Sequence, residues 1–310
     1  MCGRSSELRP RAVRSGAVTP SSTAARNAGR AGLEASPADY HLHTTLSDGE
    51  GSAAELVARA QELGLPEIGV ADHVIGSSVD DGTGVRHERL EEYVAGVRAA
   101  GPTSGGPRVL VGMEVDYTRD TLDEVSSLVE RYRPDYVIGS VHLVDGFAFD
   151  APRYIDDYRR FDLEDLWCSY FAAVAEAARS GMFTVLGHID LIKKFGLRPP
   201  LTHRVAGAAE TALVATAEAG AAVELNTSGW RHPVGEQYPS AALLRLARTL
   251  RIPLTFGSDA HEPGLVGADF TDAVSLARDA GYRSWLRLSD RCEVPLAGVT
   301  AGADDRAALS

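Results

Sequence analysis

The chain has 310 residues, of which 44% are hydrophobic and 24% are charged, the composition of a globular protein with a sizeable core. No apolar run is long enough to cross a bilayer, which argues against a transmembrane enzyme. The formal net charge of -12 argues against a general nucleic-acid binder, but it allows a small anionic substrate because bound metal ions can reverse the local field of a site.

The two ends of the chain differ in composition from its middle. Residues 1–38 are rich in arginine, have only Glu7 and Glu34 as acids, and show no hydrophobic period. We expect a disordered extension here; a transit peptide is the alternative, although the amphipathic stripe of such a peptide is missing. Residues 296–310 are small and polar and predict a tail. One folded domain is therefore expected at 39–295.

The three cysteines, Cys2, Cys168 and Cys292, lie far apart and form no C-x-x-C pair. This spacing argues against a disulfide framework and against a cysteine-rich zinc site. We therefore expect a reducing, cytoplasmic location and no membrane partner.

Between the two ends, short apolar runs alternate with helical stretches. Strands are expected at 39–42, 67–71, 109–111, 136–139, 184–186, 222–225 and 254–256, and helices at 53–63, 88–99, 121–132, 163–179, 205–219, 240–250 and 269–280. The first helix begins with a capping box of Ser52 and Glu55 and ends at Gly64. Seven strand–helix units predict an α/β fold with a parallel sheet, and periodicity leaves an open sheet and a barrel as alternatives.

Histidines and acids recur directly after six of the seven predicted strands. In chain order they are His41, His43, Asp48, Asp72, His73, Glu114, His142, His188, Asp190, Asp259 and His261. In a barrel these positions lie at the C-terminal ends of the strands, where the active sites of this architecture form. The other three histidines, His87, His203 and His232, fall outside the pattern, and we expect them on the surface or behind the site.

This pattern predicts a multinuclear metal site. On an extended strand His41 and His43 point to the same side, so both imidazoles can reach one ion. Gathering so many ionisable groups without metal would be costly, because carboxylates repel and polar groups stay unpaired. Imidazole and carboxylate without thiolate suit Zn²⁺, Mn²⁺ or Fe, and about nine ligands suit two or three ions. Such a cluster serves phosphoryl displacement; amide hydrolysis is the rival use.

The strings that contain these residues resemble motifs of the PHP (polymerase and histidinol phosphatase) superfamily. Residues 39–49 (DYHLHTTLSDG) resemble its opening motif, and residues 71–73 (ADH), 187–190 (GHID) and 257–261 (GSDAH) match later motifs in the correct order. Within the superfamily the chain is most similar to the histidinol-phosphate phosphatases, on residues 135–142 (DYVIGSVH), 187–196 (GHIDLIKKFG) and 224–231 (ELNTSGWR). The resemblance covers about 38–285.

The resemblance implies a distorted TIM-like (β/α)7 barrel and three metal sites. It assigns one ion to His41, His43, Glu114 and Asp259, a second to Glu114, His142 and His188, and a third to Asp48, His73 and His261. It also places Glu114, Asp259 and His261 among the catalytic residues. A metal-bound hydroxide is expected to attack a phosphate monoester, and the leaving alcohol takes its proton from Asp259 or from a metal-bound water.

The substrate implied is L-histidinol phosphate, hydrolysed in histidine biosynthesis. Candidates for contact with the substrate are Arg231, Lys193, Lys194 and Asn226. The loop 76–86 and the segment 145–160 are expected to form the pocket wall. The amine of histidinol requires an acid, and Glu88, Asp145, Asp150 and Glu236 are the alternatives.

Three other functions compete with this one. The first is a PHP phosphoesterase for another small phosphate ester, because the ligands set the reaction and the pocket loops set the substrate. The second is a nuclease, which the lack of a basic track disfavours. The third is a non-catalytic metal-binding module, which the complete ligand set disfavours. The sequence leaves the oligomeric state open.

Overall fold

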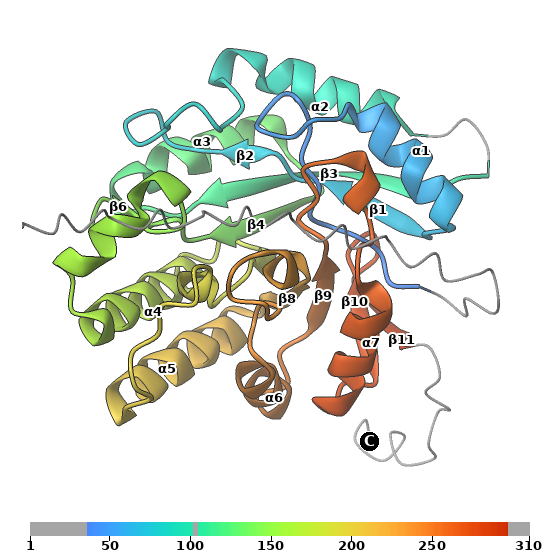
Figure 1. Cartoon of the computed structure of the whole chain (residues 1–310). Helices are drawn as coiled ribbons and strands as arrows, with labels where there is room; N and C mark the ends of the chain where they lie inside the picture. The colour runs from blue at the N-terminus through green and yellow to red at the C-terminus, as the bar shows by residue number, and fades with distance from the viewer. Residues whose placement is uncertain (1–35, 102–104, 297–310) are drawn as a thin grey trace, which may run out of the picture. The chain divides into compact units, whose positions relative to one another are not determined.

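A parallel sheet that follows the chain in order forms the centre of the protein (Figure 1). The computed structural model describes residues 36–101 and 105–296, so nearly all of the predicted tail and of the predicted N-terminal extension lies outside the described residues. The sheet strands lie in the order β1 (Glu67–Val70), β3 (Arg108–Asp116), β4 (Tyr136–Ser140), β7 (Val185–Leu186), β8 (Ala222–Asn226) and β9 (Leu254–Gly257), and β2 (His73–Val74) pairs with β3.

An extended segment, residues 39–43, joins the two edges of this sheet. On one side Gly69 and Ala71 donate backbone hydrogen bonds to the carbonyls of Asp39 and Leu42. On the other side the Tyr40 N–H donates to the Phe256 carbonyl of β9 at 3.0 Å, and isolated parallel bridges pair Asp39 with Ile68 and Leu42 with Ala260. The sheet is therefore closed, which confirms the predicted TIM-like barrel, although the first predicted strand forms isolated bridges and not a regular ladder.

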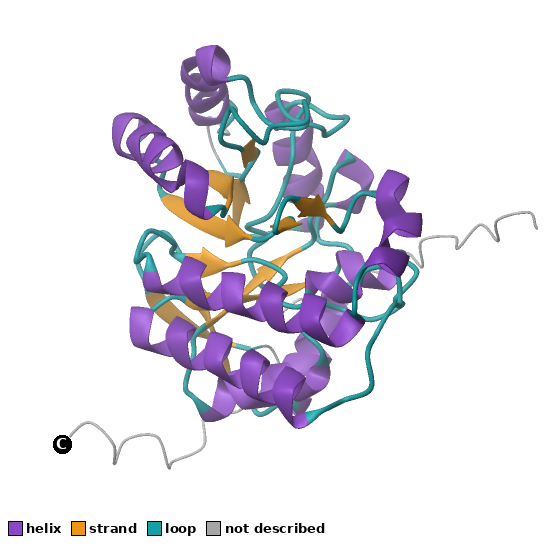
Figure 2. Ribbon diagram, turned by 90° about the vertical axis from the view of Figure 1, so that its left-hand side faces the viewer, coloured by secondary structure: helices purple, strands orange, loops and turns teal. Residues whose placement is uncertain are grey.

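The seven predicted helices are present, each within two residues of its expected ends. They are α1 (Ala53–Leu63), α2 (Leu90–Ala99), α3 (Leu122–Tyr132), α4 (Leu163–Arg179), α5 (His203–Ala219), α6 (Ala241–Thr249) and α7 (Phe270–Asp279). They lie outside the strands (Figure 2). Both bonds of the predicted capping box form at the start of α1, and Gly64 ends that helix with φ 70°.

Short elements that periodicity does not detect complete the chain. The antiparallel pairs are β5 (Leu143–Val144) with β6 (Phe147–Ala148), and β10 (Ser284–Arg287) with β11 (Cys292–Pro295). The 3-10 helices are η1 (His87–Arg89), η2 (Arg119–Thr121), η3 (Pro152–Arg160), η4 (Leu191–Lys193), η5 (Ser228–Arg231) and η6 (Pro263–Leu265). Apart from η3, which has nine residues, these elements have two to four residues and are too short to show a repeating apolar pattern.

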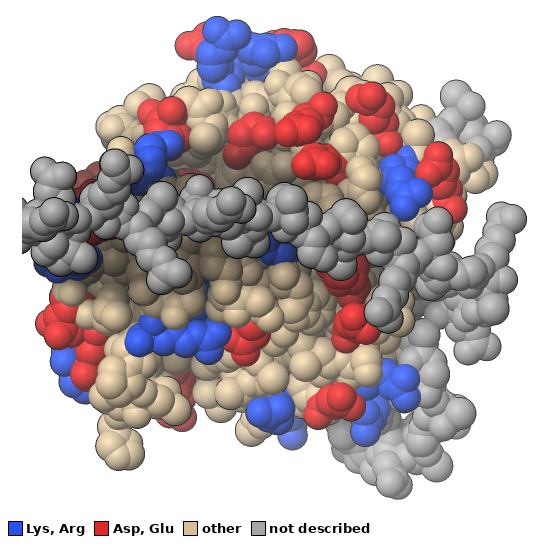
Figure 3. Space-filling view, viewed as in Figure 1, with Lys and Arg blue, Asp and Glu red and all other residues tan. Residues whose placement is uncertain are grey.

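The face of the molecule drawn in Figure 3 is mixed in charge. On the face drawn in Figure 3, Lys and Arg side chains lie among Asp and Glu side chains and form no continuous basic stripe over the visible described residues. Within residues 36–101 and 105–296, no helix has both the length and the apolar composition needed to cross a membrane. Cys168 and Cys292, the two described cysteines, are both free, as expected.

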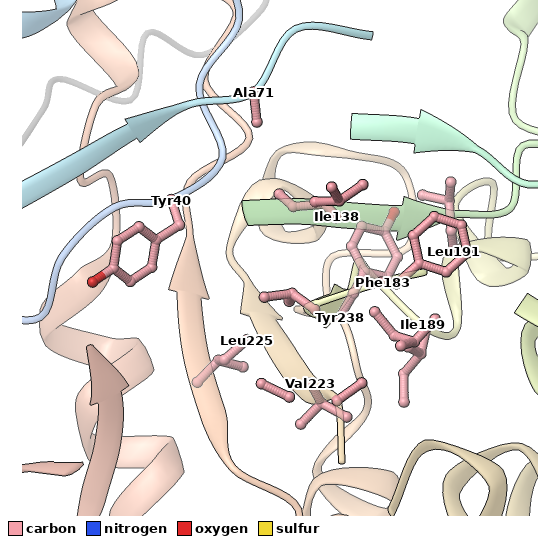
Figure 4. Close-up of a cluster of buried hydrophobic side chains, with 14 of the residues drawn as sticks. Tyr40, Ala71, Ile138, Phe183, Ile189, Leu191, Val223, Leu225 and Tyr238 are labelled. Carbon is pink, nitrogen blue, oxygen red and sulfur yellow. The ribbon is translucent and has the colours of Figure 1, made fainter. Parts of the chain in front are cut away.

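The apolar core lies around the strands and continues into the segments that follow them. Figure 4 shows part of it, in which Ile138 of β4 and Val223 and Leu225 of β8 lie near Ile189 and Leu191 of the segment after β7. These five side chains are 3% exposed or less. The polar residues that follow each strand therefore rest on a rigid apolar floor, which limits how far they can move.

The capping box of α1 is testable. Replacing Ser52 with Ala removes the side-chain acceptor for the Glu55 N–H, so we expect the free energy of unfolding to fall by about 1 kcal/mol. Urea unfolding measures it. Ser127→Ala in the middle of α3, where the exposed hydroxyl bonds the Asp123 carbonyl, is the control and should have almost no effect. Equal losses in the two variants would contradict the capping role.

Candidate metal centre

The nine predicted metal ligands lie together at the C-terminal ends of the strands. Their nitrogen and oxygen atoms form four overlapping groups in which all ligand atoms lie within 4.8 Å of one another. The groups are His41–His43–Asp259, His41–Glu114–His188, His73–Glu114–His142 and His43–Asp48–His73–His261. None of them includes His87, His203 or His232, in agreement with the prediction for these three histidines.

Glu114, on β3, lies at the centre of the groups and is fully buried. Its Oε1 faces one pair of histidines, with His188 Nε2 at 3.0 Å and His142 Nε2 at 3.7 Å. Its Oε2 faces another pair, with His41 Nε2 at 3.1 Å and His43 Nε2 at 3.6 Å. A carboxylate with different partners on its two oxygens has the arrangement of a bridging ligand. This geometry is compatible with the bridging role that the resemblance implied.

Asp259 completes the group around His41 and His43. Its Oδ1 lies 3.3 Å from His43 Nε2 and 3.9 Å from His41 Nε2. Asp259 adopts a left-handed conformation with φ 54°, which is uncommon for a residue with a side chain and costs on the order of 1 kcal/mol or more. The conformation directs this carboxylate toward the two histidines.

The third predicted set, Asp48, His73 and His261, lies on the more exposed side. His261 Nε2 and His73 Nε2 lie 3.3 and 3.7 Å from Asp48 Oδ1. His73 also has its Nδ1 atom 2.9 Å from Glu114 Oε2, so its ring lies between this set and the buried glutamate. His43 Nδ1 approaches Asp48 at 3.9 Å. The assignment of each residue to one particular ion therefore stays a prediction.

The electrostatics of the centre fit divalent cations. Several ligand atoms are buried and have no hydrogen-bond partner among the described residues, including His41 Nε2, both ring nitrogens of His43, and Glu114 Oε2. Burial alone would raise the pKa of Glu114, but His41 and His73 hold it well below its usual value. Burial, with His261 and His73 nearby, lowers the pKa of His43 to about 3. A buried carboxylate and a neutral imidazole with free lone pairs are what a divalent ion binds.

Four acids that were not among the predicted ligands support the ligands from behind. Asp116 Oδ1 lies 2.8 Å from His142 Nδ1, and Glu224 Oε1 lies 2.6 Å from His41 Nδ1. Asp72 accepts hydrogen bonds from the N–H and hydroxyl of Thr44 and from the hydroxyl of Ser47, which lie in the loop that leads to Asp48. Asp39 accepts hydrogen bonds from the N–H and hydroxyl of Ser258, the residue before Asp259. The sequence signal for Asp116 is its spacing of two from Glu114, which places both side chains on the same face of β3.

A cavity of about 600 Å³ opens onto the exposed side of the centre. Asp48, His73, Asp116 and His142 form its inner end. Its walls include Val79, Asp81 and Thr83 from the loop 76–86, and residues of the segment 145–160 from Asp145 to Arg160. The predicted pocket wall is therefore confirmed.

The predicted substrate contacts differ in their surroundings. Lys194 lines the cavity, with Nζ 3.3 Å from Asp150 Oδ2. Lys193 is 1% exposed, and its ammonium contacts Asp190 at 2.9 Å, Glu236 at 3.0 Å and the Gln237 carbonyl at 2.7 Å. These three partners can use all its protons, an arrangement that favours a structural role, and the substrate contact of Lys193 stays a prediction.

Arg231 and Asn226 are also bonded within the protein. The Arg231 guanidinium donates to the carbonyls of Thr227 and Ser258 and lies 3.3 Å from Asp269, with its side chain 24% exposed. The Asn226 amide donates to Glu224 Oε2 at 3.0 Å and to Asp259 Oδ2 at 3.2 Å. Both residues therefore hold the loops around Asp259, and a direct contact of either with substrate stays a prediction.

Comparison with known proteins gives a consistent result. Residues 39–228 match the model of a family described as the PHP domain. The chain is 40% identical over 250 residues to a Deinococcus radiodurans protein named probable histidinol-phosphatase, covering 79% of this chain and 94% of that protein. It is 28% identical over 256 residues to the histidinol-phosphatase of Bacillus subtilis, covering 74% and 95%.

A solved structure shares the fold. The histidinol phosphate phosphatase of Lactococcus lactis, in complex with zinc, L-histidinol and phosphate, superposes with a TM-score of 0.66 at 20% identity, covering 84% of this chain and 99% of that one.

The central place of Glu114 predicts a loss of metal in Glu114→Gln. The amide lacks the charge that compensates the ions and offers one acceptor oxygen in place of two, so we expect the bound metal per chain to fall by at least half. Elemental analysis of purified protein measures it. Glu67→Gln is the control, because Glu67 is equally buried but lies at the start of β1 and bonds Tyr40 and Ser289. A Gln variant at 114 with its full metal content would contradict the bridging role.

Proposed function

The chain belongs to the PHP domain family, and on that premise we propose that it is a metal-dependent phosphomonoesterase that hydrolyses L-histidinol phosphate to L-histidinol and phosphate. The observation that carries the proposal is the 40% identity that extends over 94% of a protein named for this activity, on a chain whose nine predicted ligands lie in one cluster. The reaction is a step of histidine biosynthesis.

The cofactors are two or three divalent ions, for which zinc is the candidate seen in the related Lactococcus lactis complex, and manganese and iron suit the same ligands. When bound, such ions lower the pKa of coordinated water toward neutrality and neutralise charge on phosphate oxygens. The chain itself holds the buried histidines and Glu114 in fixed positions. The exposed set of Asp48, His73 and His261 lies toward the cavity, where a phosphate group would enter.

The residues around Asp259 favour its charged form and fix the orientation of its carboxylate. Burial would raise the pKa of Asp259, but His41 and a hydrogen bond with His43 hold it well below its usual value. Its Oδ2 accepts from Asn226 and from the Ser228 hydroxyl at 3.1 Å. A carboxylate with these partners is an acceptor, so we propose that Asp259 binds and orients, and that the proton of the leaving alcohol comes from water.

The cavity has groups of both charges for a substrate that is anionic at one end and cationic at the other. Lys194 lies where it can meet phosphate. Of the four acids proposed for the amine, Asp145 and Asp150 line the cavity, Asp150 as the partner of Lys194, whereas Glu88 and Glu236 lie outside its lining. The stacked rings of Phe147 and Phe161, with centroids 4.5 Å apart, supply an aromatic wall for an imidazole.

The alternative is a PHP phosphoesterase for another small phosphate ester, because the ligands would serve it equally. The mixed charge of the face in Figure 3 supports the prediction that nucleic acid is not a partner. We propose a cytoplasmic location, which the free cysteines support.

The substrate is tested by phosphate release from L-histidinol phosphate and from a panel of other phosphomonoesters, with Zn²⁺ or Mn²⁺ supplied. We expect kcat/KM for histidinol phosphate to exceed the others by about 10- to 100-fold, because hydrogen bonds to a charged amine contribute about 1.5–3 kcal/mol. Chelation of the metal should abolish the release. Slow release from every ester would favour the alternative substrate.

Asp150 provides a test of amine recognition. Asp150→Asn should raise KM for histidinol phosphate about tenfold or more, and because Asp150 also pairs with Lys194, a smaller change is expected for p-nitrophenyl phosphate, which has no amine. Asp156→Asn is the control, since Asp156 lies nearby on the 3-10 helix η3 but is exposed and outside the cavity lining. Equal changes in KM for the two substrates would show that Asp150 does not bind the amine.

A further inference from the structure

Glu224, on β8, is a buried acid with partners in two of the groups of ligands. It is 1% exposed. Its Oε1 lies 2.6 Å from Nδ1 of His41. Its Oε2 accepts a hydrogen bond from the backbone N–H of His188 at 3.0 Å and another from the Asn226 amide, also at 3.0 Å. That amide donates in turn to Asp259 Oδ2. One carboxylate therefore contacts His41 and His188 directly and reaches Asp259 through Asn226.

The space for this carboxylate depends on a neighbouring glycine. A Cβ atom at Gly257, the last residue of β9, would lie 1.9 Å from Glu224 Oε1 and 2.7 Å from the Cβ of His41. Both distances are far below van der Waals contact. Residue 257 must therefore lack a side chain if Glu224 is to reach His41.

We propose that Glu224 is the positioning residue that holds His41 and His188 in register for metal binding. The proposal rests on the metal-dependent function above. With Glu224 Oε1 as acceptor, the His41 proton lies on Nδ1, which leaves the lone pair of Nε2 free. His41 Nε2 faces Glu114 and Asp259 and has no hydrogen-bond partner among the described residues. A carboxylate behind a histidine sets the tautomer and the ring orientation in this way.

The second carboxylate oxygen of Glu224, Oε2, holds the backbone conformation of His188. His188 has φ 20°, a conformation that a residue with a side chain rarely adopts. The hydrogen bond from its N–H to Glu224 Oε2 holds that conformation, and the ring then places Nε2 3.0 Å from Glu114 Oε1. The same acid thus orients the ligands that face the two oxygens of Glu114.

Glu224→Gln is the direct test, because a glutamine has the size of the glutamate but only one acceptor oxygen. If that oxygen faces His41, an NH₂ group faces the donors of His188 and Asn226. If it faces His188, the NH₂ group forces the His41 proton onto Nε2, where metal would bind. In either orientation we expect the Zn²⁺ affinity to fall about 10- to 100-fold, measured by titration against a competing chelator together with zinc per chain.

Glu67→Gln is again the matched control, since it changes an equally buried acid at the other end of the barrel and should keep wild-type affinity. The melting temperatures of the metal-free proteins separate a local effect from general instability. Gly257→Ala is a second, independent variant, which should lose affinity to a similar degree because the added methyl group displaces Glu224.

The outcomes distinguish this proposal from the function on which it rests. A wild-type chain that binds no zinc would overturn the metal-dependent function itself. If the wild type binds zinc and both Glu224→Gln and Gly257→Ala bind it equally tightly, the positioning role of Glu224 is wrong. Loss of affinity in both variants, with Glu67→Gln unchanged, is the expected result.

Discussion

The negative charge of Glu114 is the constraint on which the rest of the site depends. The carboxylate is fully buried, a position that is costly for a charged group unless it is compensated. Five histidines approach it within 4 Å, from four separate places in the chain: the segment 39–43, β2, and the ends of β4 and β7. Each of these histidines must therefore be held by the fold, and the closed barrel supplies the positions.

The closure of the barrel has a chemical consequence. Segment 39–43 hydrogen-bonds to β1 on one side and to β9 and the residues that follow it on the other, and this placement brings His41 and His43 next to Asp259. If the segment formed a strand at one edge of an open sheet, these residues would lie at opposite edges. The predicted ligands that follow the different strands can therefore meet in one site only when the sheet closes.

Burial changes across the site, and the change separates the roles of its residues. His41, His43 and Glu114 are completely buried, whereas the side chains of Asp48 and His261 are 31% and 37% exposed. The buried part can hold ions away from water, and the exposed part opens onto a cavity whose wall has acids, a lysine and aromatic rings. Two further acids restrict the imidazole rings: Asp116, at the inner end of the cavity, contacts His142, and Glu224, outside the cavity lining, contacts His41.

The sequence by itself determined the seven helices and most of the strands, because helical periodicity, capping residues and short apolar runs are local signals, and its family motifs named the nine residues that cluster. It could not distinguish Lys193 from its neighbour Lys194, since adjacent lysines look alike until the chain turns through η4 and buries the first against Asp190 and Glu236. The tertiary structure also decided which acids face the cavity, and that Glu224 lies behind His41. These choices depend on contacts between residues far apart in the chain, such as the 183 positions between His41 and Glu224, and no local pattern encodes them.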